Sequence, residues 1–470
     1  MGGRVDIDDT KAHDFSSLGL RSDLLENVAS LGYATMTPIQ AQSLPHVLKG
    51  EDVIGQGKTG SGKTAVFGLG IMNRLVVENL STQALVVCPT RELADQVCKA
   101  LRQLARMTPN VKIISLCGGM PMRAQLSSLL HGAHIVVGTP GRICKHLRKE
   151  TLRIDSLITL VLDEGDRMLE MGFQEEVDVI IDSTPLEKQT LLFSATFPDE
   201  IQAIANKVMN DPITVAIDVS HDADTINQIF YRIGSEGERK GALKRILSSE
   251  ALESTVIFCK TKLETEEIKD ELISEGYDAI ALHGDLGQRD RDEALIRFTN
   301  RSASIMVATD VAARGLDIDA LDRVINYHLP RDPEVYVHRI GRTGRAGSKG
   351  VACSLYAKWD SEQKDEIFKL GGGTVKERDL PTVSRNQNGV AQAAMVTLIL
   401  RLGRKQKLRA GNLLGALTGP EGIAGSQVGK IVVGDEYSYV AVERGIKGAA
   451  LAKLSKETWK GRAIRAWALK

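Results

Sequence analysis

Short apolar runs alternate with longer amphipathic stretches along most of the chain, and this alternation constrains the fold more than any other feature. Such runs are typical of buried strands in a parallel sheet, with helices crossing between them. A first series of strands is expected at 53–55, 84–88, 111–116, 134–138, 159–163 and 190–194. A second series is expected at 228–233, 255–259, 278–282, 304–309 and 322–327. The two series predict two α/β domains that meet near 211–225.

The end of the chain follows a different pattern. Residues 369–390 are punctuated by glycine and proline, lack periodicity, and are expected to form a linker. Beyond them we expect the order strand 395–401, helix 411–417, strand 430–433, strand 437–442, helix 447–455 and strand 462–469. This βαββαβ order predicts a small α+β domain over 391–470, with a ferredoxin-like sheet of the RRM type.

The same tail carries an excess of positive charge. The chain has 60 basic and 60 acidic residues and is formally neutral, but residues 391–470 hold 14 Lys and Arg against 5 Asp and Glu. The tail therefore carries a net charge of +9 and the remainder −9. This asymmetry favours a polyanion-binding tail, although an ordinary basic face would give the same composition.

The composition excludes several classes of protein. Hydrophobic residues make up 43% and charged residues 26%, as in soluble globular proteins rather than disordered or fibrous ones. No stretch approaches 18 apolar residues, and the first residues are polar and acidic rather than signal-like, so we expect a cytoplasmic protein. The six cysteines show neither CxxC nor Cys/His spacing, which argues against a disulfide or zinc framework.

A glycine-rich loop carries the strongest local signal of chemistry. Residues 57–64, GKTGSGKT, fit the pattern GxxxxGK[ST] and lie between the strand at 53–55 and an apolar helix from Ala65. Glycines let backbone N–H groups converge on phosphate oxygens, and the following helix adds its positive end. Lys63 would reach the β- and γ-phosphates and Thr64 a Mg²⁺ ion. The loop residues expected at the phosphates are Gly60, Ser61, Gly62, Lys63 and Thr64.

A pair of carboxylates follows about a hundred residues later. The apolar strand at 159–163 ends in Asp163, and Glu164 comes next. Asp163 can hold the magnesium ion, while Glu164 can polarise an attacking water. A strand that ends in two acids can also be a solvated turn, but the phosphate loop in the same chain favours the catalytic interpretation.

Here the sequence resembles a known family, the DEAD-box ATP-dependent RNA helicases. Residues 163–166 read DEGD, and the other motifs occur in order over residues 13–358: GYATMTPIQ (32–40), PTREL (89–93), TPGR (139–142), SAT (194–196), IFCKT (257–261), ARGLD (313–317) and HRIGRTGR (338–345). The resemblance implies a first RecA-like ATPase domain over 1–215 and a second RecA-like domain over 226–368. It also implies hydrolysis of ATP to ADP and phosphate with Mg²⁺.

The resemblance assigns further nucleotide contacts. Gln40 matches the glutamine that reads adenine, since an amide both donates to and accepts from the base edge. Phe15 resembles the aromatic that stacks on adenine, although a single Phe is usually a core residue. Asp317 would contact the ribose. Arg342 and Arg345 resemble arginine fingers, whose planar charged forks match the γ-phosphate oxygens.

The resemblance also assigns coupling and RNA-binding residues. Ser194, Thr196, Asp166 and His338 match positions that link ATP hydrolysis to unwinding, although His338 could instead be a packed core residue. Contacts to the RNA backbone are implied from both domains, and backbone contacts position RNA without reading its sequence. The matching positions are Arg91, Gly118, Gly119, Thr139, Gly141 and Arg142 in the first domain, and Gly284, Arg291 and Thr309 in the second. Each of these arginines could also be an ordinary surface charge.

Three positions depart from the family pattern. Gly165 replaces the alanine of the DEAD motif, and we expect it to loosen the loop that couples to Ser194 and Thr196. Gly57 replaces the alanine that usually begins the phosphate loop. Met36 replaces a proline near the adenine pocket and removes a backbone restraint. We expect modest effects on the coupling of ATP use to unwinding.

The tail resembles the RNA-binding domain of the bacterial DEAD-box protein A (DbpA) subfamily. The resemblance rests on LGRKQKLR (402–409), LGALTG (414–419), VGKI (428–431) and YSYVAV (437–442). It implies binding to 23S ribosomal RNA near the peptidyl-transferase centre, and action in ribosome assembly. Alternation along the third strand places Tyr437 and Tyr439 on one face, where such sheets stack bases, although the two rings could also only pack. Basic residues could instead dominate recognition: Arg401, Arg404, Lys405, Lys407, Arg409, Lys430, Arg462 and Arg465.

The sequence therefore predicts an ATP-dependent RNA helicase whose partner is structured RNA, with no membrane or DNA partner expected. Two alternatives stay open. One is a general messenger-RNA-remodelling or cold-shock helicase, which would respond equally to unrelated structured RNAs. The other is an ATP-gated RNA clamp without productive turnover, which Gly165 suggests and the intact Glu164, Arg342 and Arg345 oppose.

Overall fold

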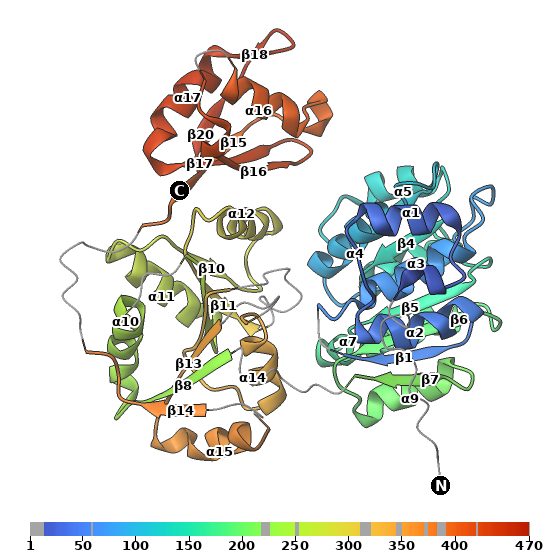
Figure 1. Ribbon diagram of the computed structural model, residues 1–470, viewed down its shortest axis with the longest axis horizontal. Coiled ribbons are helices and arrows are strands. Elements are labelled where there is room, and N and C mark those ends of the chain that lie inside the picture. The colour runs from blue at the N-terminus through green and yellow to red at the C-terminus, as the bar shows by residue number, and fades with distance from the viewer. Residues whose placement is uncertain are drawn as a thin grey trace. The chain divides into compact units, whose positions relative to one another are not determined.

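The computed structural model describes residues 14–57, 60–217, 226–249, 253–310, 321–344, 350–370, 375–382, 392–419 and 422–469. The chain divides into two compact units with a boundary at residues 219 and 220 (Figure 1). Asp317 and Arg345, both predicted to bind the nucleotide, lie outside the described residues. Among the described helices, none is long and apolar enough to cross a membrane.

The first unit is built on a seven-stranded parallel sheet with the order β3-β4-β2-β5-β6-β1-β7. The six predicted strands are confirmed as β1 to β6, and β7, which was not in the predicted series, lies at the edge of the sheet. Their bounds are β1 (Val53–Gln56), β2 (Ala84–Val87), β3 (Ile113–Leu116), β4 (Ile135–Gly138), β5 (Thr159–Asp163), β6 (Gln189–Ser194) and β7 (Ile213–Ala216). Most of these strands are buried on both faces, as expected for a parallel sheet between two helical layers.

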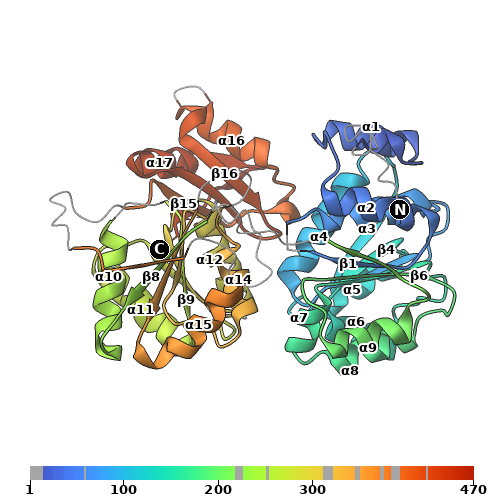
Figure 2. The same ribbon diagram turned by 60° about the horizontal axis from the view of Figure 1, so that its bottom comes forward.

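Helices cover both faces of this sheet (Figure 2). One apolar cluster joins the sheet to α1 (Ser22–Ser30), α2 (Pro38–Lys49), α3 (Lys63–Arg74) and α4 (Arg91–Leu104). A second cluster joins the opposite face to α5 (Met122–Leu129), α6 (Pro140–Arg148), α7 (Gly165–Glu170), α8 (Gln174–Asp182) and α9 (Asp199–Val208). The loops at the carboxyl ends of the strands are thereby held between two packed layers, where ligands bind in open α/β sheets.

The second unit contains another seven-stranded parallel sheet, with the order β10-β11-β9-β12-β13-β8-β14. Its strands are β8 (Ile226–Arg232), β9 (Thr255–Cys259), β10 (Ala279–Leu282), β11 (Ile305–Thr309), β12 (Arg323–Asn326), β13 (Gly350–Tyr356) and β14 (Val375–Arg378). The described helices are α10 (Arg239–Ser249), α11 (Lys262–Ser274), α12 (Gln288–Thr299), α14 (Pro333–Ile340) and α15 (Ser361–Leu370).

Strand β14 corrects the prediction that residues 369–390 are only a linker. Residues 375–378 pair with β8 at the edge of the second sheet, and Arg245 donates from its side chain to the carbonyls of Leu380 and Pro381. Three of the four residues of β14 are charged and exposed. Charged residues are common on edge strands because they discourage pairing with other chains, so this strand has no hydrophobic signal.

The C-terminal domain confirms the predicted βαββαβ order (Figure 1). Its antiparallel sheet has the order β16-β17-β15-β20, and α16 and α17 pack on one face through an apolar cluster. The bounds are β15 (Met395–Leu400), α16 (Ala410–Thr418), β16 (Val428–Val433), β17 (Ser438–Glu443), α17 (Lys447–Lys456) and β20 (Ala466–Ala468). The expected last strand at 462–469 is interrupted, because β18 (Thr458–Trp459) and β19 (Arg462–Ala463) form a separate short hairpin.

Candidate nucleotide and RNA sites

The phosphate loop lies between β1 and α3, as its sequence predicts. Gly62 precedes the first turn of α3 with φ of 100°, a conformation that favours glycine. Lys63 is buried, and its Nζ donates to the carbonyl of Gly57 at 2.5 Å. The Ser61 hydroxyl is buried and has no hydrogen-bond partner among the described residues. An unsatisfied hydroxyl beside a converging glycine loop fits a bound phosphate oxygen.

Asp163 ends β5 beside this loop and is almost fully buried. Burial raises its pKa to about 7, although the charge of Lys63 opposes the shift. A carboxylate held in this environment gains from a cation, and its oxygen ligand suits Mg²⁺. Asp163 and the Thr64 hydroxyl therefore fit the metal that the phosphate loop implies.

Glu164 follows in the left-handed conformation with φ of 52° and ψ of 56°. Its Oε2 accepts from Arg167 Nη1 at 2.9 Å, and both side chains are about nine-tenths buried. The two neighbouring acids have different surroundings, because Glu164 pairs with Arg167 and Asp163 lies in the field of Lys63. Two adjacent carboxylates can therefore serve different purposes.

Asp166 joins the DEGD segment to the SAT segment. Its Oδ2 accepts from the backbone N–H of Ala195 at 3.1 Å, from the backbone N–H of Thr196 at 2.9 Å and from the Thr196 hydroxyl at 3.0 Å. The Ser194 hydroxyl accepts from the backbone N–H of Asp166 at 3.0 Å. The carboxyl ends of β5 and β6 are thus linked by four hydrogen bonds, and the predicted coupling residues of this unit lie together.

Gly165 lies inside this linked segment, at the start of α7. A Cβ added there would lie 3.1 Å from Leu192 Cδ1 and 3.2 Å from Ile201 Cδ1. Both neighbours are flexible side-chain ends, so an alanine would require only small shifts. The four bonds through Asp166 and Ser194 restrain the segment whether residue 165 is glycine or alanine.

Gln40 packs against the phosphate loop. Its Nε2 donates to the carbonyl of Gly62 at 3.2 Å, and its Oε1 accepts from the backbone N–H of Thr37 at 2.9 Å, which completes a capping box at the start of α2. Phe15 is 4% exposed and stacks on Tyr33 with ring centroids 6.2 Å apart. Met36 is buried in the same apolar cluster as Phe15.

The predicted RNA contacts of the first unit follow β2, β3 and β4. Arg91 begins α4, where the Thr90 hydroxyl caps the helix by accepting from Leu93. Its guanidinium lies against Gly118 and Gly119 so closely that a Cβ on Gly119 would lie 1.8 Å from Nη1. Arg142 donates to the carbonyl of Met120 at 2.9 Å and to Gln125. Thr139 and Gly141 lie at the start of α6.

The first sheet is therefore divided along its carboxyl edge. The candidate phosphate, metal and coupling residues follow or end β1, β5 and β6, whereas the candidate RNA residues follow β2, β3 and β4. These two groups occupy neighbouring halves of the sheet. The hydrogen bonds through Asp166 lie in the nucleotide half.

In the second unit, Gly284 and Thr309 follow or end β10 and β11, and Arg291 lies in α12. His338 lies in α14, and Arg342 follows this helix with 8% of its surface exposed. Arg339, between them, was missed by the sequence reasoning. Its fork donates to both oxygens of Asp310, at 2.6 and 2.7 Å, and a third group donates to Asn326 and to the carbonyl of His328.

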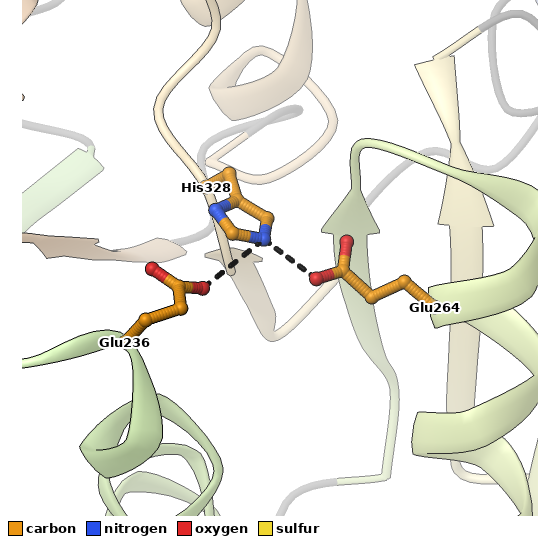
Figure 3. A group of neighbouring side chains, drawn as sticks. All are labelled: Glu236, Glu264 and His328. Carbon is orange, nitrogen blue, oxygen red and sulfur yellow. Dashed lines mark hydrogen bonds and ion pairs between the residues drawn. The ribbon is translucent and has the colours of Figure 1, made fainter.

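A second ionic cluster lies at the carboxyl edge of this sheet (Figure 3). His328 Nε2 lies 2.6 Å from Glu264 Oε1 and 3.9 Å from Glu236 Oε1. These three side chains could together reach one cation. However, Arg239 already donates to both oxygens of Glu236, at 2.8 and 3.0 Å. Glu236 is therefore already paired with Arg239, and Glu264 with His328, within the protein.

The two tyrosines of the C-terminal sheet contact α12 of the same unit. Tyr439 is 7% exposed, and its hydroxyl donates to Glu293 at 3.1 Å. The Arg289 guanidinium lies over the Tyr437 ring, 4.5 Å from its centroid. On the same sheet face, Thr397 and Ile399 of β15 are fully buried, and the Thr397 hydroxyl lies 2.6 Å from that of Ser302. In this arrangement Tyr439 is buried against α12, whereas the half-exposed Tyr437 ring has the Arg289 guanidinium over it.

Two further contacts hold this domain against the second sheet. Asp278 accepts from Arg444 at 2.6 Å and from the backbone N–H of Ala393 at 2.7 Å.

Most of the predicted basic residues of this domain are on the surface. The exposed ones are Arg401, Arg404, Lys405, Lys407, Arg409, Lys430 and Arg465. Lys405 pairs with Glu436 at 2.6 Å, and Arg404 donates to the carbonyl of Val433.

Known protein families match three successive parts of the chain. The DEAD/DEAH box helicase family matches residues 37–204, the helicase conserved C-terminal domain matches 238–347, and the DbpA RNA binding domain matches 397–467. The chain is 48% identical to the ATP-dependent RNA helicase DbpA of Escherichia coli, over 95% of the chain and 97% of that protein. It is 42% identical to the DEAD-box ATP-dependent RNA helicase CshA of Bacillus cereus, over 80% of the chain and 71% of that protein.

Solved structures agree with these matches. The structure of Saccharomyces cerevisiae Dbp5 bound to RNA and ADP BeF3 has a TM-score of 0.72 and 30% identity, over 80% of this chain and 97% of that one. That structure contains RNA and a nucleotide analogue on the same kind of scaffold.

Proposed function

Because this chain belongs to the DEAD/DEAH box helicases and carries a DbpA-type RNA-binding domain, it is an ATP-dependent RNA helicase, and we propose that it acts on 23S ribosomal RNA during assembly of the large ribosomal subunit. In this proposal the C-terminal domain selects the RNA and the two RecA-like domains separate a short duplex near it. The enzyme would act in the cytoplasm.

The match of the C-terminal domain supports this target most strongly. The likeness to the E. coli DbpA protein extends over 95% of the chain, whereas the likeness to the CshA proteins stops at about four-fifths. A general cold-shock or messenger-RNA helicase would not need this domain. Its exposed basic residues supply the charge that a folded RNA requires.

For the ATPase reaction we assign roles to the chain's own groups. Lys63 and the loop residues Gly60 to Gly62 would hold the phosphates, while Thr64 and Asp163 would hold Mg²⁺. The bound metal would neutralise charge that develops on the phosphates. Glu164 would orient and deprotonate the attacking water, and Arg342 and Arg345 would stabilise the charge on the γ-phosphate. Gln40, Phe15 and Asp317 would hold the adenosine.

We also propose that hydrolysis is linked to RNA through Asp166, Ser194, Thr196 and His338. RNA would lie along Arg91, Gly118, Gly119 and the start of α6 in the first domain, and along Gly284, Arg291 and Thr309 in the second. The domain limits that accompany this assignment are 1–215, 226–368 and 391–470.

The experiment compares the ATPase of the full chain with two RNAs at fixed salt. One is a 23S fragment that carries the peptidyl-transferase-centre hairpin, and the other is an unrelated structured RNA of equal length. Fixed salt is essential because phosphate contacts make affinity salt-dependent. Preferential stimulation by the ribosomal fragment supports the proposal. Equal stimulation would favour a general helicase, and RNA binding without any stimulation would favour a clamp.

A further inference from the structure

The C-terminal domain contains a cavity of about 350 Å³ on the side of its sheet that carries α16 and α17. Its floor is apolar and includes the buried side chains of Leu402, Leu413 and Ile464. The half-buried Trp459 of β18 and the turn of α16 around Gly415 also line it. We call this space the Trp459 cavity. It lies on the face opposite Tyr439, whose side of the sheet contacts α12.

Trp459 is held in place by the protein. Its indole Nε1 donates to the carbonyl of Gln406 at 2.9 Å, and its strand pairs with β19. The polar group of the ring is therefore satisfied within the domain. Trp459 lines the cavity and is partly exposed, and an indole is a large planar apolar group that suits stacking by another planar ring.

Gly415 lies in the interior of the nine-residue helix α16. A Cβ at this position would meet no atom within 4 Å, so no close contact inside the protein requires a glycine. Glycine weakens a helix interior relative to alanine. Gly415 is exposed and lines the cavity, so a larger side chain at this position would stand at the edge of the cavity.

The groups around the cavity suit a nucleotide. Asn412, Lys453 and Glu457 line it and supply hydrogen-bonding groups for the edge of a base. The neighbouring segments carry exposed positive charges, which suit phosphates on either side of such a base. These charges are Arg404, Lys405, Lys407, Arg409, Lys456 and Lys460. A planar apolar slot inside a basic rim matches one nucleotide of a single-stranded segment.

We propose that the Trp459 cavity binds one unpaired base of the target RNA, stacked on Trp459 beside Gly415, with the adjoining phosphates on the basic segment 404–409. This inference rests on the proposed function, because it names the part of the C-terminal domain that recognises RNA. It places base recognition on the helical side of the sheet rather than at Tyr437 and Tyr439.

The test compares two identical substitutions in one helix. Gly415→Leu adds a bulky side chain at the edge of the cavity, whereas Gly411→Leu adds the same side chain one turn earlier, where a Cβ also meets nothing within 4 Å and which does not line the cavity. Affinity of the full chain is measured with the 23S fragment and with an unrelated hairpin that has an unpaired loop. Circular dichroism confirms that both variants are folded.

We expect Gly415→Leu to weaken binding by about tenfold or more, the effect of losing one stacked base. The slope of log affinity against log salt should stay unchanged, because the phosphate contacts remain. Gly411→Leu should bind within about twofold of the parent chain. Equal affinities for the two variants would overturn the proposal and leave the cavity for a side chain of a protein partner.

A second readout follows the base itself. With 2-aminopurine in the unpaired segment, binding should quench the fluorescence of one position, and Gly415→Leu should abolish that quenching.

The two proposals can be separated. If the parent chain binds both RNAs equally, the proposed ribosomal target is wrong, but weaker binding of both RNAs by Gly415→Leu still supports the cavity. If the parent chain prefers the 23S fragment and Gly415→Leu binds it normally, only the cavity proposal fails.

Discussion

The acidic side chains at the carboxyl edges of the two parallel sheets differ in how they are paired. In the first unit, burial raises the pKa of Asp163 to about 7, and the Ser61 hydroxyl is left without a hydrogen bond from the described residues. In the second unit, Asp310 is bonded to Arg339, and Glu264 to His328. The first edge therefore holds one acid, Asp163, whose burial favours a cationic ligand, beside the internally paired Glu164 and Arg167. At the second edge, Asp310 and Glu264 both have partners within the protein.

This difference distinguishes residues that bind a ligand from residues that stabilise the fold. A buried acid without a full complement of partners costs stability, and such groups are concentrated at functional sites. A buried acid with a forked arginine partner contributes order, and removing one member leaves the other unpaired. We therefore expect substitutions at the first edge to change catalysis, and substitutions at the second edge to change stability.

The largest expected effect is at the first edge. Asp163→Asn should lower RNA-stimulated kcat by about 10²–10³-fold, because the metal loses a charged ligand. The melting temperature without nucleotide should stay the same or rise, because the substitution removes a carboxylate whose ionisation is disfavoured by burial. Steady-state ATPase and calorimetry measure the two quantities. An ATPase within tenfold of the parent chain would remove Asp163 from the catalytic site.

The second prediction is a loss of stability, rather than of catalysis, from a substitution at the second edge. Arg339→Met should destabilise the second unit by about 3–5 kcal/mol, because Asp310 and Asn326 lose their partner inside the protein. Urea unfolding followed by circular dichroism measures the change. The matched control is the double variant with Asp310→Asn, which removes the unpaired charge and should recover part of the loss. Equal stabilities for the single variant and the parent would contradict the comparison.

The alternation of apolar runs predicts most of both sheets, because strands buried between two helical layers must be apolar. It misses β13 and β14 of the second sheet. Strand β13 is central, yet it includes Ser354, which is fully buried and accepts from Asn326 at 3.1 Å. Strand β14 is charged because it lies at an edge. In both cases tertiary context decides the structure.

The candidate sites divide in the same way. The sequence motifs predict where Lys63, Asp163 and Asp166 lie, because each motif is a short segment at the end of one strand. The motif around Arg342 also contains Arg339, but its bond to Asp310 joins residues 29 apart. The covered face of the C-terminal sheet depends on α12, which is more than a hundred residues away. Alternation predicts that face correctly but gives no information about what packs on it.

The third prediction concerns coupling within the first edge. Asp166→Asn should leave RNA-stimulated ATPase within about threefold but lower unwinding per ATP by about tenfold. The amide would place an N–H₂ group or a weaker acceptor against three donors, and a charged hydrogen bond contributes about 1.5–3 kcal/mol. A duplex-unwinding assay with parallel ATPase measures the ratio. Parallel loss of both activities would instead assign Asp166 to the chemical step.

The smallest expected effect is a pH dependence at the second edge. Burial opposes ionisation of Glu264, but the His328 hydrogen bond and charge, with the backbone N–H of Lys260, hold its pKa below the ordinary value. A carboxyl whose folded-state pKa is lowered stabilises the fold above its unfolded pKa of about 4.3, and this contribution is lost as pH falls through the folded value. Because Glu264 is partly exposed, we expect it to contribute about 1 kcal/mol. Calorimetry at pH 7 and pH 3.5 should show a smaller loss of stability for Glu264→Gln than for the parent chain. Identical losses would mean that the Glu264–His328 contact does not contribute to stability, so the pairing at the second edge would depend on Arg339 and Arg239 instead.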